Sequence, residues 1–201
     1  MPQAVVIATG NAGKVSEFCA ILKGSAFSFL VSKDVGFIEE IEETAQTFKG
    51  NAEIKAKAVF EYVSQKYKDY WVVADDSGLE VEALGGRPGV FSARYAGENA
   101  TGVERYTKLL QEMERQTNRN ARFVCSLCLI RPGRRPEFFE GECRGSILPQ
   151  ARGSGGFGYD PVFLPEGYSN GFGEMSEEEK NALSHRGRAI RSMLERLNAE
   201  T

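Results

Sequence analysis

The chain has 201 residues, of which 41% are hydrophobic and 26% charged, and its formal net charge at pH 7 is −3. These values are typical of a soluble globular protein long enough to bury a core, in one domain or two closely packed lobes. A weakly negative chain has no general attraction for nucleic acid or an anionic membrane, so we expect neither as a partner. The first residues lack the features of a signal peptide, and no segment is as long as a transmembrane helix, so we expect a cytoplasmic protein.

The first predicted strand, Ala4 to Ala8, leads into a loop at 9–14 and then into a helix that Gly24 ends. A strand, a glycine-containing loop and a helix present free backbone amides and a positive helix end, which suit phosphate. The loop lacks the P-loop pattern because only two residues separate Gly10 from Gly13. The loop alone favours the interpretation of these glycines as ordinary turn residues.

The helix after this loop is predicted from apolar positions with helical spacing, which are Val15, Phe18, Cys19 and Leu22. Lys14 stands at the start of the helix, where a positive charge opposes the helix dipole. An anion bound at this position would give the lysine a reason to be there.

An acidic connector at 37–44 follows a second predicted strand, Phe27 to Val31. A charge run is usually a solvated face, but apolar residues interrupt this one and it ends where the next helix begins. That helix is predicted over Thr44 to Tyr67, where Asn51 and Lys55 lie four residues apart and therefore share a face. Its core side carries Phe48, Ala52, Val59 and Val63.

Two adjacent acids, Asp75 and Asp76, end the apolar run Trp71 to Ala74, which predicts a buried strand. Ser77 and Gly78 then predict a turn, so that the acidic side chains leave the sheet at an edge where ligands of α/β proteins gather. Carboxylates this close repel each other, and a hard divalent cation with oxygen ligands is the usual way to hold them. A solvated turn is the alternative, and the tetrapeptide alone does not choose between the two.

Cys125 and Cys128 form a C-x-x-C inside the predicted strand Ala121 to Ile130, where a spacing of three puts them on opposite faces. There is no second C-x-x-C, and His185 is the only histidine. Buried cysteines in a reducing compartment are therefore favoured over a metal–thiolate site.

The segment from Gly102 to Leu148 is interpreted as scaffold and interface, without chemistry of its own. A capping-box pattern at Thr101 and Glu104 predicts a helix that runs toward Gln116. The strand that follows is joined by a hairpin-like turn at 131–136 to a predicted partner strand.

The string from Gly153 to Pro161 satisfies G-x-G-x-x-G, but the dinucleotide fingerprint must open a helix, which Pro161 prevents. The dinucleotide-binding interpretation therefore fails. What remains is a flexible loop that presents two aromatic side chains and an acid, which suits stacking on a planar base.

A second capping-box pattern, Ser176 with Glu179, predicts a short helix near the end of the sequence. Ser184 can cap a further helix, which places His185 and Arg186 in its first turn, where they can point at one ligand. A single histidine at a helix end is, however, more often a satisfied surface group than a catalyst. The core stripe of this last helix consists of Ile190, Met193, Leu194 and Leu197.

Five motifs stand in the order and approximate spacing of one known family. They are Thr9-Gly10-Asn11 with Lys14; Phe48 with Asn51, Ala52, Lys55 and Ala56; ADDSGLEVEALGGRPGVFSARYAG at 74–97; GGFGYDP at 155–161; and EKNALSHRGRA at 179–189. The chain resembles the inosine triphosphate pyrophosphatases, which hydrolyse non-standard purine nucleoside triphosphates. The match spans nearly the whole chain.

The resemblance implies an α/β fold with an elongated central mixed sheet flanked by helices. It implies a single domain over residues 1–201, with two lobes around an active-site cleft. It also implies a homodimer, dependence on Mg²⁺, and a nucleoside triphosphate as the small-molecule substrate. ITP, dITP and XTP would be preferred over ATP and GTP, with the nucleoside monophosphate and pyrophosphate as products.

By this resemblance, Asp76 is a metal ligand and the proton acceptor, with Asp75 beside it. Glu42 or Glu43 completes the acidic site, and the Glu-Glu-Thr motif favours Glu43. Ser77 lies near the triphosphate. The residues that the resemblance assigns to holding the triphosphate are Thr9, Gly10, Asn11, Ala12, Gly13, Lys14 and Lys55.

The same resemblance implies a base pocket in which Phe157 stacks on the purine, while His185 and Arg186 approach the carbonyl at ring position six. Lys180 would contact a phosphate or the ribose side. Guanine shares that carbonyl, and these residues do not explain how it is excluded. The full set implied for the base pocket is Phe157, Gly158, Tyr159, Asp160, Ser184, His185 and Arg186.

Two other functions fit the same residues without the resemblance. A phosphatase or nucleotidyl-transfer enzyme could use the same acidic metal site, but it would release orthophosphate or consume a second substrate. A non-catalytic nucleotide-binding module would use Asp75 and Asp76 merely to cap a turn. The number of acids beside an expected phosphate site disfavours the module, because a binder would need positive charge alone.

Overall fold

A computed structural model of the chain describes residues 2–200. The strands are β1 (Gln3–Ile7), β2 (Phe27–Val31), β3 (Trp71–Val81), β4 (Asn120–Ile130), β5 (Glu137–Ile147) and β6 (Phe163–Pro165). The α-helices are α1 (Ala12–Leu22), α2 (Phe48–Lys66), α3 (Gly102–Glu112), α4 (Glu177–Leu183) and α5 (His185–Asn198). Short 3₁₀ helices lie at Ser32–Val35, Glu82–Leu84, Gly89–Arg94, Asp160–Val162 and Phe172–Glu174.

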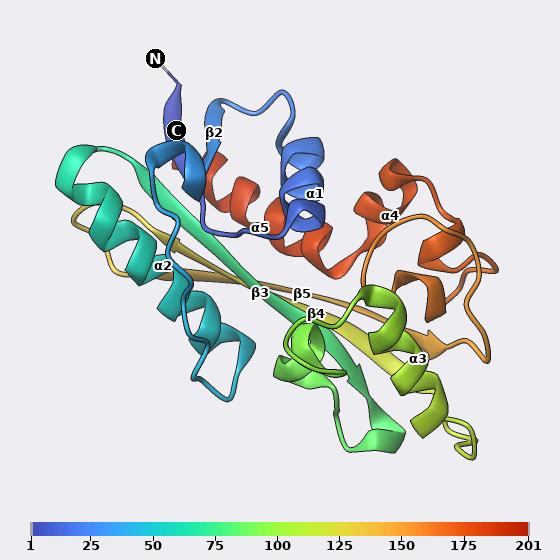
Figure 1. Cartoon of the computed structure of the whole chain (residues 1–201). Helices are drawn as coiled ribbons and strands as arrows, with labels where there is room; N and C mark the ends of the chain where they lie inside the picture. The colour runs from blue at the N-terminus through green and yellow to red at the C-terminus, as the bar shows by residue number, and fades with distance from the viewer. Residues whose placement is uncertain (1, 201) are drawn as a thin grey trace. The chain divides into compact units, whose positions relative to one another are not determined.

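The strands form one six-stranded sheet in the order β2-β1-β3-β4-β5-β6 (Figure 1). Strand β1 is parallel to β2 and β3, whereas β5 is antiparallel to β6. The predicted α/β fold, a mixed sheet flanked by helices, is therefore confirmed. Within residues 2–200, no helix combines the length and the apolar character that a membrane span requires.

The chain divides into two compact units. Unit 1 contains the chain up to Asp76, Cys125–Glu140 and the chain from Ala189 onward. Unit 2 contains Ser77–Val124 and Gly141–Arg188. Strands β3, β4 and β5 each contribute residues to both units.

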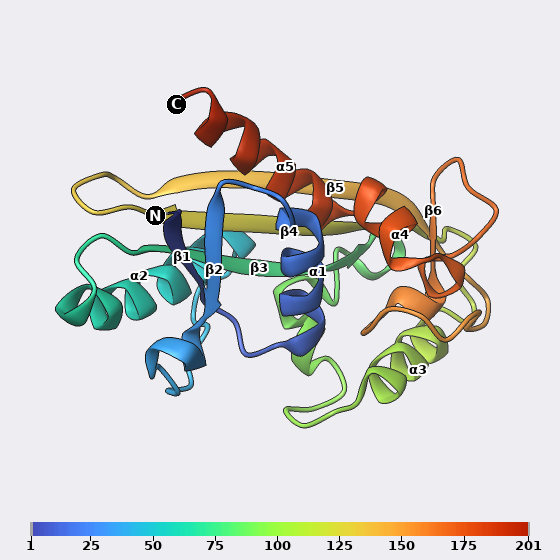
Figure 2. The same ribbon diagram turned by 90° about the horizontal axis from the view of Figure 1, so that it is seen from above.

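In unit 1, the alternation of side chains along the strands separates two apolar layers. On β1, Val5 and Ile7 belong to one layer and Val6 to the other. The first layer packs α1 and α5 against the sheet, with Phe18 and Met193 among the buried side chains. The second layer packs α2 against the sheet (Figure 1). Figure 2 shows β1 and β2 side by side in this unit.

The cysteines of β4 follow the predicted alternation. Cys125 lies in the layer of α1 and α5, and Cys128 lies in the layer of α2. All four cysteines are free thiols, and three are buried. The prediction was wrong for Cys19, which is exposed, because Phe18 and Leu22 form the buried face of α1 and Cys19 lies outside it.

Unit 2 has an apolar core of its own, to which β3, β4, β5 and α3 contribute. Phe123, Phe163 and Phe172 form its aromatic centre. The ring centroids of Phe123 and Phe163 lie 4.7 Å apart, and those of Phe163 and Phe172 lie 5.1 Å apart. Each fully buried side chain of this size contributes about 1.5–3 kcal/mol to folding.

Helix boundaries follow the capping residues. The predicted capping boxes are confirmed at the starts of α3 and α4. Helix α2, however, begins at Phe48 and not at Thr44, because Thr47 is extended and its hydroxyl accepts a hydrogen bond from the Gly50 amide at 3.1 Å. Helix α3 ends at Glu112, short of the predicted Gln116.

Arg131, in the turn between β4 and β5, connects this turn to Glu200 in unit 1. Its guanidinium is ion-paired with Glu137 and Glu200 and lies 5.2 Å from the centre of the Trp71 ring. The hydrogen bond from Arg131, with the charges of Arg131 itself and two further arginines, lowers the pKa of Glu200 to about 2.

We expect Glu200→Gln to lower the melting temperature at neutral pH. Because the pKa of Glu200 is lowered on folding, its contribution is fully present above about pH 4.5 and is lost as the pH falls toward about 2. Thermal melts from neutral to acid pH should show the gap between parent and variant closing in that window. Glu195→Gln, at an exposed position of α5, is the control. A gap that stays constant with pH would contradict the prediction.

Candidate functional site: a buried carboxylate cluster and a buried cation cluster

Asp75 and Asp76 lie inside strand β3, which continues to Val81. The predicted turn at Ser77 and Gly78 is therefore wrong. The pairing of β3 with β1 stops earlier, since the last register pair joins Ile7 and Val73 and the Ala8 amide donates to the Val73 carbonyl at 2.8 Å. The two acids thus occupy the stretch of β3 just beyond the end of its parallel neighbour, where side chains of adjacent loops can reach them.

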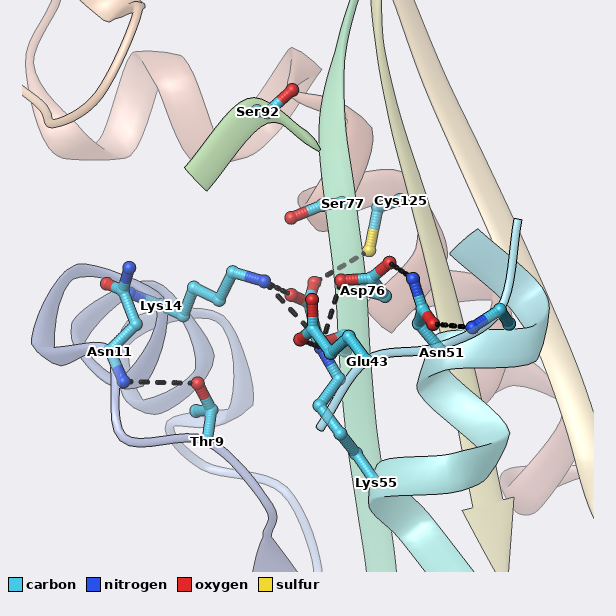
Figure 3. A network of polar contacts seen from close by, with 12 residues as sticks. Thr9, Asn11, Lys14, Glu43, Asn51, Lys55, Asp76, Ser77, Ser92 and Cys125 are labelled. Atoms are coloured by element: carbon cyan, nitrogen blue, oxygen red, sulfur yellow. Dashed lines mark hydrogen bonds and ion pairs between the residues drawn. The ribbon is translucent and has the colours of Figure 1, made fainter. Parts of the chain in front are cut away.

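Both acids are buried, with exposed fractions of 1% for Asp75 and 5% for Asp76. Adjacent strand residues point to opposite faces, and each acid meets a different helix. Lys14 of α1 is ion-paired with Asp75. Lys55 of α2 is ion-paired with Asp76 (Figure 3). Positive charge therefore compensates both carboxylates, and two lysines supply it.

Asp75 faces α1 and β4. Its Oδ1 is ion-paired with the Lys14 ammonium, and its Oδ2 lies 2.9 Å from the Cys125 thiol. Helix α1 begins at Ala12, so Lys14 lies in its first turn, and the Asn11 side chain accepts a hydrogen bond from the Lys14 amide at 3.2 Å. The Asp75 carboxylate is thus an anion that accounts for a lysine at this helix start.

Asp76 faces α2. The Lys55 ammonium lies 2.9 Å from Asp76 Oδ1 and 2.6 Å from Glu43 Oε1. The Asn51 amide donates to Asp76 Oδ2 at 3.3 Å, and its oxygen accepts from the Ala45 amide at 2.9 Å. The shared face of Asn51 and Lys55 is confirmed, and Asn51 also fixes the acidic connector that carries Glu43 (Figure 3).

The structure distinguishes the two glutamates of the connector. Glu43 is half-buried and reaches the cluster through Lys55, whereas Glu42 is exposed. Thr9 lies in the loop between β1 and α1, where its hydroxyl accepts a hydrogen bond from the Asn11 amide at 3.2 Å. The carboxylates of this cluster are therefore Glu43, Asp75 and Asp76.

The cluster holds more negative than positive charge. Burial raises the pKa of Asp76, and Lys55 and Lys14 counteract this only in part, while Glu43 adds to it. For Lys55, burial lowers the pKa, but Asp76, Glu43 and Asp75 together outweigh it and raise the pKa above its ordinary value. Asp76, whose pKa is raised, is thus ion-paired with Lys55, whose raised pKa keeps it protonated.

The donor atoms of the cluster decide whether it suits a metal ion. Among residues 2–200, no three His, Cys, Asp or Glu side chains converge closely enough to hold a metal ion, and lysine ammoniums are ion-paired with the carboxylates of the cluster. The donors themselves are buried carboxylate oxygens, the type that hard cations such as Mg²⁺ prefer. The chemistry of the donor set therefore fits Mg²⁺.

The second group of site residues lies in unit 2, around Phe157. The Lys180 ammonium is ion-paired with Asp160 and lies 4.7 Å from the centre of the Phe157 ring. The Arg186 guanidinium lies 5.7 Å from the same ring and donates to Ser77 Oγ at 2.8 Å. Arg186 is among the largest fully buried side chains of the described chain.

The loop of unit 2 presents one aromatic side chain and not the two predicted. Tyr159 is buried, and its hydroxyl donates to the Ser92 carbonyl at 2.9 Å. Asp160 is also buried and accepts a hydrogen bond from the Phe157 amide at 2.7 Å. Phe157 is only half-buried and remains the aromatic ring of this loop that a ligand can reach.

The glycines of this loop serve packing. A Cβ at Gly156 would lie 2.2 Å from Asp160 Oδ2, and Gly156 has a φ of 72°. Gly158 also has a positive φ, of 63°. The G-x-G-x-x-G string therefore reflects close approach and left-handed backbone, in agreement with the rejection of a dinucleotide fold.

His185 opens α5, as predicted, but it is buried. Its ring stacks on Phe123 with centroids 4.7 Å apart and an interplanar angle of 9°. Ser184 caps the helix by accepting a hydrogen bond from the Gly187 amide at 3.1 Å. The histidine is therefore packed against the aromatic core of unit 2 and is not a solvated surface group.

The sequence does not predict that Cys125 belongs to the cluster. It lies in the segment interpreted as scaffold, yet its thiol contacts Asp75. Fifty positions separate the two residues, and no local pattern links them. Only the prediction that Cys125 and Cys128 face opposite ways indicated that one of them would reach the face of β3 that carries Asp75.

The sequence model of the Ham1 family matches residues 5–196. This chain belongs to the Ham1 family. The dITP/XTP pyrophosphatase of Bacillus licheniformis is 45% identical over 191 residues, which cover 94% of this chain and 95% of that protein. The dITP/XTP pyrophosphatase of Flavobacterium psychrophilum is 46% identical over 191 residues, which cover 95% of this chain and 97% of that protein. The solved Staphylococcus aureus Ham1 protein is 36% identical, with a TM-score of 0.87, and covers 99% of this chain and 100% of its own.

The charge pairing in unit 1 can be tested with a double-mutant cycle in urea denaturation. Lys55→Met should lower the free energy of unfolding by about 3 kcal/mol, because it leaves buried carboxylates without their partner. Adding Asp76→Asn should restore part of that loss. The more exposed pair Lys57–Glu53, with a 2.6 Å contact, is the control and should show a much weaker coupling. Equal coupling in the two cycles would contradict the prediction.

Proposed function

We propose that this protein hydrolyses non-standard purine nucleoside triphosphates (ITP, dITP and XTP) to the nucleoside monophosphate and pyrophosphate, and so cleanses the nucleotide pool. The observation that carries the proposal is the buried cluster of three carboxylates and two lysines around Asp75 and Asp76. The Bacillus licheniformis relative, which is 45% identical and is named dITP/XTP pyrophosphatase, supports the substrate class.

We further propose Mg²⁺ as the cofactor, held by Asp76, Asp75 and Glu43. Oxygen donors suit this cation, and the excess negative charge of the cluster favours it. Glu42 is exposed and is left out of the proposed ligands. When bound, Mg²⁺ would neutralise charge on the polyphosphate and polarise the bond to be cleaved.

Cleavage between the α and β phosphates needs a water directed at the α-phosphorus and a group that accepts its proton. Asp76 suits this role because burial raises the pKa of its carboxyl toward the working pH, which makes it a better base. Lys55 holds one of its oxygens and Asn51 the other, so the carboxylate keeps a fixed orientation.

Lys14 and Lys55 are the proposed phosphate ligands of unit 1. Both ammoniums bind carboxylates in this structure, and a triphosphate would offer them a second anionic partner. The start of α1 adds backbone amides that suit an anion. The other residues proposed to hold the triphosphate are Thr9, Gly10, Asn11, Ala12 and Gly13, with Ser77 nearby.

For unit 2 we propose base recognition. The half-buried ring of Phe157 offers a face for stacking, and Arg186 and His185 offer donors for the six-keto oxygen of the purine. Adenine carries a donor at that position and would leave these groups unpaired, and such rejection can reach ~10⁴-fold. Lys180 is assigned to the Phe157–Asp160 group, which it contacts directly. Gly158, Tyr159, Asp160 and Ser184 would shape this pocket.

We also propose that the whole chain acts as a single catalytic domain, as a homodimer in the cytoplasm. The match to the family over residues 5–196 supports the first point. Light scattering tests the second, and a monomer mass would contradict it.

Asp76→Asn should lower kcat by about 100-fold or more, because the amide cannot accept the proton of the water. Binding of the triphosphate, followed by calorimetry with a non-hydrolysable analogue, should be largely retained. Asp69→Asn, at an exposed position next to β3, should leave both quantities unchanged. Near-normal turnover of Asp76→Asn would remove Asp76 from the proposed role.

Arg186→Ala should lower the ratio of kcat/KM for ITP over ATP by about 10-fold or more, because it removes a charged donor to the base. The dependence of turnover on Mg²⁺ concentration should change little. Arg188→Ala, an exposed arginine two positions along α5, serves as the control. An unchanged ITP/ATP ratio in Arg186→Ala would exclude it from base recognition.

A further inference from the structure

The thiol of Cys125 and the carboxylate of Asp75 form a buried contact that the proposed mechanism does not use. Cys125 Sγ lies 2.9 Å from Asp75 Oδ2, and Cys125 and Asp75 are 0% and 1% exposed. The two residues come from neighbouring strands, β4 and β3. The contact lies on the face of β3 that Lys14 also approaches.

The direction of the hydrogen bond follows from the chemistry of the partners. The Asp75 carboxylate, ion-paired with Lys14, can only accept hydrogen bonds, so the thiol donates. Asp75 is thereby held on both oxygens, Oδ1 by the ammonium and Oδ2 by the thiol. Removing the thiol would take one hydrogen bond from the buried Asp75 Oδ2 and leave the Asp75 side chain freer to rotate.

We propose that Cys125 is a positioning residue that fixes the Asp75 carboxylate for binding the divalent cation. This inference rests on the proposed function, in which Asp75 belongs to the metal ligands. Partners that orient a metal ligand commonly change metal affinity by roughly 10-fold or more when they are removed. A thiol suits this position because it donates a hydrogen bond and, as a small apolar side chain, also packs well in the layer of α1 and α5.

Cys128 supplies a matched control within the same strand. It is also 0% exposed, but it faces the other layer, where α2 packs. Truncating either cysteine removes one buried sulfur from β4 and leaves a cavity of similar size. Of these two cysteines it is Cys125 that donates a hydrogen bond to Asp75, so the two variants separate positioning from packing.

The test is the binding of Mn²⁺ to the full chain, followed by electron paramagnetic resonance without nucleotide. We expect Cys125→Ala to weaken Mn²⁺ binding roughly 10-fold, and Cys125→Ser, which keeps a donor, to bind more tightly than the alanine variant. Cys128→Ala should bind like the parent, although its melting temperature falls as that of Cys125→Ala does. Parent-like Mn²⁺ binding by Cys125→Ala, an equal loss in Cys128→Ala, or no rescue by serine would overturn the proposal.

A second readout does not involve the metal. The S–H stretching band of Cys125, identified as the infrared band lost in Cys125→Ala, should shift when Asp75→Asn weakens the acceptor. An unshifted band would overturn the hydrogen bond itself. Neither measurement needs turnover, so a chain that releases no pyrophosphate would contradict the proposed function while the Cys125 comparison still gives its own answer.

Discussion

Two adjacent carboxylates in the middle of β3 set the main constraint on unit 1. Taking an isolated carboxylate out of water costs several kcal/mol or more, and Asp75 and Asp76 are both almost fully buried. Neighbouring strand residues face opposite ways, and each of the two carboxylates is ion-paired with a lysine from a different helix. Lys14 of α1 pairs with Asp75 on one face of the strand, and Lys55 of α2 pairs with Asp76 on the other.

This arrangement carries a desolvation penalty that folding alone does not require. Apolar residues at the same positions would pack without the desolvation penalty, and replacing buried ion pairs by apolar side chains is often neutral or stabilising. Moreover, Glu43 gives the cluster a third carboxylate for two lysines. A binding module for an anion would have no use for this excess of negative charge, whereas an enzyme that works with a cation and a polyphosphate would.

Local signals in the sequence predict much of the fold and of the candidate site. Capping side chains mark the starts of α3 and α4, and the four-residue spacing of Asn51 and Lys55 places both on Asp76. Tertiary contacts override such signals elsewhere. Ser77 and Gly78 have turn propensity, but the pairing of β3 with its neighbours keeps them in the strand. The contact of Cys125 with Asp75 depends on how distant strands pair, which no local pattern encodes.

The most direct test is to identify the products formed from ITP, XTP, GTP and ATP, with and without Mg²⁺, while resolving pyrophosphate from orthophosphate. We predict pyrophosphate and the monophosphate from ITP and XTP, only with Mg²⁺, and little product from ATP and GTP. Orthophosphate as the product would contradict cleavage between the α and β phosphates. No turnover of any of the four nucleotides would contradict the enzymatic function altogether.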